Sequence, residues 1–151
     1  MIKINIGCGR DYREGWLNTD ISKEVKADVY LDIRKDKLPF KNGEVEEIYI
    51  SGVLEQILKN EDLIFAMNEC HRVLKSGGII NIVVPNGGFK ISVRDPMDCR
   101  KFIPETFQYF HYESRYYKLY GSVYGFFAWD VLLINTNSNK IMEIKMKKYV
   151  S

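Results

Sequence analysis

Cysteine and histidine are both scarce, with three cysteines and two histidines among 151 residues. The cysteines at positions 8, 70 and 99 are odd in number and their spacing fits no zinc motif. This argues against a disulfide framework and against a structural metal ion. We therefore expect reduced thiols, no metal site and a cytoplasmic protein.

Long apolar runs are also missing. No run approaches the ~20 residues that a helix needs to cross a bilayer, and no secretory leader precedes the first strand-like segment. Internal repeats and low-complexity linkers are absent as well. A length of 151 residues suits one globular unit with its own core. The sequence predicts a single domain over residues 1–151, without a membrane span.

The chain has no strong charge of either sign, because 22 Lys and Arg stand against 20 Asp and Glu. So small a surplus does not favour nucleic acid as a partner. The distribution is uneven, however: residues 76–151 hold 10 basic and 6 acidic side chains, and residues 102–129 hold 12 of the 20 aromatic ones. Single-stranded nucleic-acid binding stays open as an alternative, although such a segment is more often core.

What the chain does have is a strand that runs into a glycine turn. Ile2 to Ile6 alternate apolar and polar side chains, and Gly7-Cys8-Gly9 follows directly. Glycine lets the backbone turn tightly and lets a ligand approach it closely. A second strand over 17–21 carries Asp20 near its end, and a carboxylate there can accept hydrogen bonds from both ribose hydroxyls. The arrangement is typical of nucleotide sites.

Strand-like and helix-like segments then alternate along the chain. The pattern predicts strands over 28–33, 47–51 and 79–84, with a short helix over 52–58 and a longer one from an Asn60 N-cap to a Gly77-Gly78 stop. Beyond residue 100 it predicts a helix over 104–112 and an antiparallel hairpin of 127–134 and 141–149. We expect a three-layer Rossmann-like α/β fold with a mostly parallel sheet and an antiparallel C-terminal hairpin.

The first crossover is short. Only ten residues, Gly7 to Trp16, separate the first two strands, whereas a parallel crossover usually takes a dozen or more and carries a helix. One face of the sheet should therefore be thinly covered and expose apolar surface. Together with the aromatic surplus, this predicts a two-fold homodimer or a partner subunit that completes the cover.

Six short motifs follow one another through the first half of the chain: Ile4-Asn5-Ile6-Gly7-Cys8-Gly9, Gly15-Trp16-Leu17-Asn18-Thr19-Asp20-Ile21, Asp32-Ile33, Leu38-Pro39-Phe40, Val53-Leu54-Glu55 and Arg72-Val73-Leu74-Lys75-Ser76-Gly77-Gly78. In this order they resemble the class I S-adenosylmethionine-dependent methyltransferases. The branch they resemble is the small type 11-like one, which is often linked to glycan and polysaccharide biosynthesis.

The resemblance implies S-adenosylmethionine as cofactor and assigns residues to it. Its amino-acid part would lie along the backbone of Gly7, Cys8 and Gly9, its ribose at Asp20 and Ile21, its adenine at Asp32 and Ile33, and its methyl end at Ser51 and Gly52. The implied reaction is in-line methyl transfer to a small-molecule acceptor, such as a sugar or a related hydroxyl or amine. Taken singly, Asp20 could instead be a solvated strand end, Asp32 an N-cap and Cys8 a small turn residue.

The residues that would act on the acceptor are less clearly marked. Glu55, Asp98 and His111 are the candidates. The branch usually carries histidine at the positions of Gly52 and Gln56, and often near Asp98, and this chain has none of the three. The missing imidazoles keep open a second hypothesis, a cofactor-binding or regulatory subunit without catalytic activity.

Overall fold

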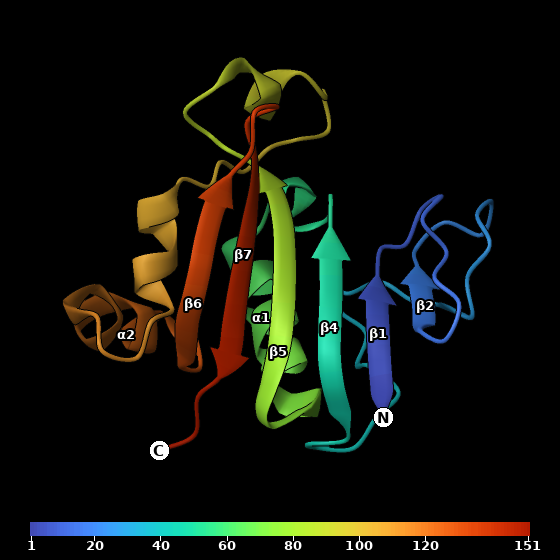
Figure 1. Ribbon diagram of the computed structural model, residues 1–151, viewed down its shortest axis with the longest axis horizontal. Coiled ribbons are helices and arrows are strands. Elements are labelled where there is room, and N and C mark those ends of the chain that lie inside the picture. Colours follow the sequence, from blue (N-terminus) through green and yellow to red (C-terminus); the bar gives the residue numbers. More distant parts are fainter.

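The computed structural model describes residues 1–151, and its centre is a seven-stranded sheet in the order β3-β2-β1-β4-β5-β7-β6 (Figure 1). The strands are β1 (Ile2–Ile6), β2 (Leu17–Asp20), β3 (Val29–Tyr30), β4 (Val45–Ser51), β5 (Leu74–Pro85), β6 (Trp129–Thr136) and β7 (Ile141–Lys148). The first five run parallel, and β7 lies antiparallel between β5 and β6. The expected Rossmann-like α/β fold with an antiparallel C-terminal hairpin is confirmed.

Helical structure is sparse and concentrated after β4. It comprises η1 (Leu54–Gln56), α1 (Asn60–Val73), η2 (Lys90–Val93), η3 (Pro104–Tyr109), η4 (Tyr117–Gly121) and α2 (Ser122–Tyr124). Only α1 exceeds two turns, so the helices predicted over 52–58 and 104–112 are each reduced to short 3₁₀ segments. None of the helices has the length and apolar character that a bilayer span requires.

The long helix α1 ends earlier than the sequence suggested. Its N-cap is Lys59, with Asn60 as the first helical residue, and its last residue is Val73. The predicted stop at Gly77-Gly78 is wrong because Leu74 already pairs with Val45 of β4 and begins β5. Gly77 instead lies in the irregular start of that strand, where its φ of 75° suits glycine.

One face of the sheet carries the hydrophobic core. Alternating side chains of the central strands point to this face and are buried, among them Ile48, Ile82 and Ile144. The buried side of α1 and the aromatic segment 102–129 pack against them, contributing Met67, Phe107 and others to one cluster. These contacts place α1 and the aromatic segment on the same side of the sheet.

The opposite face has no helical layer, because the connections after β1, β2 and β3 are irregular (Figure 1). The thin cover expected from the ten-residue first crossover is therefore present, and the third layer of the fold is represented only by loops. Part of β1 is covered by the loop after the glycine turn, where the Asn5 amide donates to Asp11 O at 2.7 Å and to Asn18 Oδ1 at 3.0 Å.

This open face carries charged and polar side chains beside apolar ones such as Leu133, which is 54% exposed and pairs with Lys145. Lys3 pairs with Glu47 at 3.2 Å, and Lys147 pairs with Asp130 at 3.3 Å. The Asn81 amide also donates to Glu47, at 3.0 Å. Side chains of this kind remain hydrated, and the face can meet water without a covering partner.

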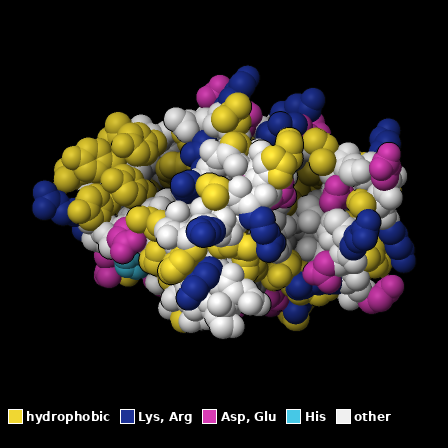
Figure 2. All heavy atoms as spheres, turned by 90° about the horizontal axis from the view of Figure 1, so that it is seen from above, with side chains coloured by type: hydrophobic (Ala, Val, Ile, Leu, Met, Phe, Trp, Pro, Cys, Tyr) yellow, Lys and Arg dark blue, Asp and Glu magenta, His cyan; other side chains and the backbone are white.

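The aromatic segment is part core and part surface. Phe102, Phe107, Phe110 and Trp129 are buried. Other aromatic and apolar side chains form an exposed patch at the end of the molecule beyond β6, visible as the yellow cluster on the left of Figure 2. We call this set the aromatic patch; its exposed members are Tyr116, Leu119, Tyr120, Val123 and Tyr124.

Candidate functional site

A cavity of about 470 Å³ opens at the carboxyl ends of β1, β2 and β4. In parallel α/β sheets this edge is where ligands bind, because the loops that leave the strands converge there. Six of the nine residues expected at the cofactor line it, namely Gly7, Gly9, Asp20, Ile21, Ile33 and Gly52. We call this space the first cavity.

The glycine turn forms one wall of the first cavity. Gly7 has a φ of 66° and Gly9 a φ of 50°, both in the left-handed region that favours glycine. A Cβ atom on Gly7 would lie only 2.2 Å from Cγ2 of Val53, whereas a Cβ on Gly9 would meet nothing within 4 Å. The backbone of Gly7 thus needs glycine for its conformation and for space, and Gly9 for its conformation alone.

Asp20 ties the end of β2 to this turn. Its Oδ2 accepts a hydrogen bond from the Gly9 N–H at 2.8 Å, and its Oδ1 accepts one from the Ser22 N–H at 2.8 Å. Each carboxylate oxygen keeps a second lone pair that can accept another donor from the cavity. The side chain is therefore fixed in place and still able to bind a pair of adjacent hydroxyl groups.

Apolar side chains beyond Asp20 form a slot for a flat group. Ile33 is buried, Leu31 is half-buried, and Ile21 is 60% exposed at the rim. Leu31 and Arg34 line the cavity without having been singled out from the sequence. The alternation of Leu31 and Ile33 within the strand-like segment is the signal that could have identified Leu31.

Three of the nine expected residues do not line the first cavity. Cys8 is buried, with its backbone N–H donating to Thr19 O at 2.9 Å and its thiol directed at Lys26 O at 3.5 Å. Asp32 is held by Arg34, whose Nε and Nη2 donate to its two oxygens at 2.9 and 2.8 Å. The hydrogen bonds from Arg34 lower the pKa of Asp32, so the carboxylate is ionised and already paired.

The third of these residues, Ser51, lines a second cavity of about 400 Å³. The second cavity shares Gly52 and Gln56 with the first, so the two spaces meet at these residues. Its lining also includes the acidic residues Glu55, Asp95 and Asp98 and one basic residue, Arg94. Glu55 and Asp98 are two of the three residues expected to act on the methyl acceptor. They therefore lie in the same cavity as Ser51 and Gly52, where the methyl end of the cofactor is expected.

Glu55 is a buried carboxyl group, with only 3% of its surface exposed and no hydrogen-bond partner for Oε2. Burial, with smaller contributions from Asp98 and Asp95, raises its pKa to about 7. Its backbone oxygen accepts the N–H groups of Cys99 and Arg100 at 2.9 and 3.0 Å, which fixes η1 to the loop that carries Asp98. The group can hold or release a proton near neutral pH.

His111 lies elsewhere. It forms a bridge with Trp129, which pairs with Lys148 at the end of the sheet where β5 begins. Its Nδ1 accepts the Val131 N–H at 3.1 Å. His111 therefore sits at the opposite end of the strands from both cavities, away from Glu55 and Asp98.

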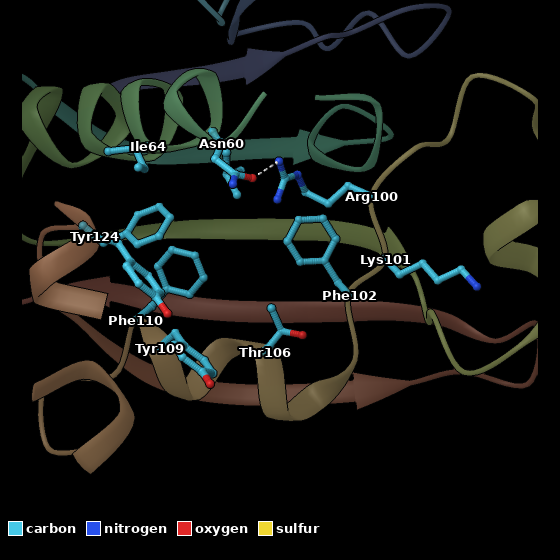
Figure 3. Close-up of a pocket in the computed structure, with 11 residues that line it drawn as sticks. Asn60, Ile64, Arg100, Lys101, Phe102, Thr106, Tyr109, Phe110 and Tyr124 are labelled. Carbon is cyan, nitrogen blue, oxygen red and sulfur yellow. Dashed lines mark hydrogen bonds between the residues drawn. The ribbon is translucent and has the colours of Figure 1, made fainter. Parts of the chain in front are cut away.

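A third cavity, of about 440 Å³, was not predicted from the sequence (Figure 3). It lies between α1 and the aromatic segment, with Ile64 on one side and Phe102, Phe110 and Tyr124 on the other. Arg100 donates to Asn60 Oδ1 at 2.9 Å at its rim. It shares no lining residue with the first or second cavity, so it is separate from the expected site.

The model of a methyltransferase domain matches residues 5–82, which span β1 to β5 and include the glycine turn, Asp20 and Glu55. No curated protein matches the chain.

Several solved structures share the fold. A SAM-dependent methyltransferase from Methanosarcina mazei superposes with a TM-score of 0.66 at 13% identity, covering 99% of this chain and 92% of its own. One from Archaeoglobus fulgidus gives 0.67 at 19% identity, covering 97% and 85%. A methyltransferase from Haloferax volcanii, solved with the Trm112 methyltransferase activator, gives 0.64 at 12% identity, covering 99% and 83%.

Proposed function

The chain belongs to the methyltransferase domain family, and from that premise we propose that the first cavity binds its cofactor, S-adenosylmethionine. The single observation that carries this placement is Asp20, held by the Gly9 and Ser22 amides and still able to accept two hydroxyl groups. Ribose presents such a pair of hydroxyls. The space beside Gly9, where an added Cβ would meet no atom within 4 Å, leaves room for the amino-acid part of the cofactor.

The remaining walls fit the other parts of the molecule. Leu31 and Ile33 offer apolar contacts to the adenine ring. Asp32 would contribute through its neighbour Arg34, which lines the cavity, because its own carboxylate is already paired. Ser51 and Gly52 lie where the two cavities meet, and this is where we place the methyl end.

The chemistry that the cofactor supplies is an electrophilic methyl group on a sulfonium. The protein contributes position: it holds an acceptor in the second cavity, in line with the methyl group, and excludes water. The acceptor is a small molecule, and we propose a sugar or a related hydroxyl or amine, as in the glycan-linked branch that the motifs resemble. Glu55 can supply the proton acceptor that the missing histidines would otherwise provide.

We expect Asp20→Ala to weaken binding of S-adenosylhomocysteine by roughly 10- to 150-fold, because it removes about 1.5–3 kcal/mol of charge-assisted hydrogen bonding. Isothermal titration measures this, with Glu24→Ala as the control, since Glu24 is exposed and does not line the first cavity. Unchanged affinity in Asp20→Ala, with the circular dichroism spectrum of the native fold, would remove Asp20 from the site.

Association with a second copy or a partner subunit remains a prediction, but we now expect the aromatic patch to mediate it in place of the open sheet face. The open sheet face is charged, whereas the aromatic patch exposes side chains of the types enriched at interface centres. One neighbour of similar fold was solved with an activator protein, so a partner of another kind is the alternative to self-association.

Light scattering at micromolar concentration should therefore show a dimer, and Val123→Glu should return it to a monomer. Val123 is 77% exposed within the patch. The matched control is Val93→Glu, at an exposed valine outside the patch, which should leave the dimer intact. A native chain that scatters as a monomer would contradict self-association.

A further inference from the structure

The second cavity contains a buried acceptor atom that nothing in the protein satisfies. Oε2 of Glu55 is inaccessible and makes no hydrogen bond, and the residue is only 3% exposed. Buried carboxylates are normally paired, because an unpaired one loses its hydration without compensation. Because Glu55 lines the second cavity, a ligand bound there can supply the missing donor when the carboxyl group turns toward it.

The charge of the surrounding wall specifies what kind of donor this is. Asp95 and Asp98 line the same cavity as Glu55, and Arg94 is the single basic residue among the lining side chains. Gln56 donates to Oδ1 of Asp98 at 3.4 Å, and no hydrogen bond is made to its other oxygen. The cavity therefore favours a ligand that carries positive charge and N–H donors together.

A chelated metal ion does not fit this wall as well as an organic cation. The structure contains no group of three or more His, Cys, Asp or Glu side chains close enough to hold a metal ion. The carboxyls are instead spread around a space of about 400 Å³, which has the size of a small organic molecule.

We propose that the acceptor bound in the second cavity is a small amine, with its nitrogen against Glu55 and its charge balanced by Asp95 and Asp98. This deepens the proposed function and rests on it, because the amine nitrogen is placed at the methyl end of the cofactor. A neutral hydroxyl of a sugar would satisfy Oε2 but would leave the acidic wall without a counter-charge.

The chemistry balances with the groups present. An ammonium gives one proton to the Glu55 carboxylate, which leaves a neutral amine with a free lone pair. That lone pair forms the N–C bond to the methyl carbon as the C–S bond breaks, and the C–S electron pair stays on sulfur in a neutral thioether. The methylated nitrogen then carries the positive charge, and Glu55 later releases its proton to solvent.

The pKa of about 7 supports this role. The other charged groups that line the cavity are Asp95, Asp98 and Arg94. Proton transfer from an ammonium is easier to an acid that titrates close to the working pH than to an ordinary exposed glutamate.

The test is a thermal-shift and calorimetric screen of small amines, each paired with the alcohol of the same skeleton, including aminohexoses with their parent hexoses. The full chain is first titrated with S-adenosylhomocysteine, the product form of the cofactor. The amines and alcohols are then added to the saturated complex. We expect at least one amine to bind about 10-fold more tightly than its matched alcohol. Glu55→Gln should remove that preference while leaving the affinity for S-adenosylhomocysteine within about twofold.

The control variant is Glu105→Gln, an exposed acid outside the cavity with the same change in net charge, which should keep the amine preference. The proposal is overturned if no amine in the screen binds better than its alcohol, or if Glu55→Gln keeps the preference. Failure of S-adenosylhomocysteine itself to bind is a separate result that refutes the proposed cofactor cavity.

Discussion

Replacing Gly7 with alanine should lower the free energy of unfolding by about 2–5 kcal/mol and abolish cofactor binding. About 1–2 kcal/mol comes from placing a Cβ at a φ of 66°, and about 1–3 kcal/mol from overpacking, because the new atom lies 2.2 Å from Cγ2 of Val53. Urea denaturation followed by circular dichroism measures the first effect, and titration with S-adenosylhomocysteine measures the second.

Two variants separate the contributions. Gly9→Ala meets no atom within 4 Å, so it should cost only the conformational part. Val53→Ala removes the contacting methyl group, and in combination with Gly7→Ala it should recover the steric part of the loss. If Gly7→Ala proves no worse than Gly9→Ala, the close approach of Val53 is not what requires glycine at position 7.

Glu55→Gln should stabilise the fold in a pH-dependent way, by about 3 kcal/mol more at pH 8 than at pH 4. The folded-state pKa is about 7 against an ordinary value of 4.5, so between these two pH values the folded protein retains a proton that the unfolded chain has lost. Below about pH 4.5 both states are protonated and the group contributes nothing. As the pH rises from about 4.5 to about 7, the native protein loses stability because only the unfolded chain ionises there, and the loss levels off above pH 7, where the folded group ionises too.

Urea denaturation of the native chain and of Glu55→Gln at several pH values between 4 and 8 measures the difference in their free energies of unfolding. Glutamine keeps the shape of the side chain and cannot ionise, so the difference isolates this one carboxyl. A constant difference across the range would mean that Glu55 titrates as an ordinary glutamate. In a chain that carries Asp98→Asn, the loss of stability with rising pH should end at a lower pH, because Asp98 contributes to the raised pKa of Glu55.

The strands that define the fold could be predicted because their local patterns agree with their tertiary environment. Ile4 and Ile6 alternate with polar side chains and are buried on one face, and the glycine turn marks where the strand ends. The end of α1 could not be predicted in this way. Gly77 resembles a helix stop, but pairing of Leu74 with Val45 had already ended the helix, and that pairing depends on residues far apart in the chain.

The bare face of the sheet was predicted from the length of the first crossover, but its polarity was not. The information was present in the alternation itself, since Lys3 precedes Ile4, Glu47 precedes Ile48, and Lys145 follows Ile144. Many of the side chains opposite the core are charged, and ion pairs form across neighbouring strands. A short crossover can therefore expose a sheet face of mixed rather than purely apolar character.

The lining of the first cavity was largely predictable because its residues lie at the ends of adjacent strands. The exceptions are side chains whose partners only the fold reveals. Asp32 points to Arg34, and Cys8 is buried beneath the turn. His111 could not be placed from its sequence neighbours, because its position depends on pairing with Trp129 in a strand that follows much later.

Calorimetric titration of the unmodified chain with S-adenosylhomocysteine, with hydrogen exchange of the complex, tests whether the first cavity is the cofactor site. We predict one binding site per chain by calorimetry. Binding should protect the amides of Gly9, Asp20 and Ile33 from exchange, because these residues surround the first cavity. No heat of binding at any concentration up to the millimolar range, or protection confined to the third cavity around Phe102 and Tyr124, would contradict the account.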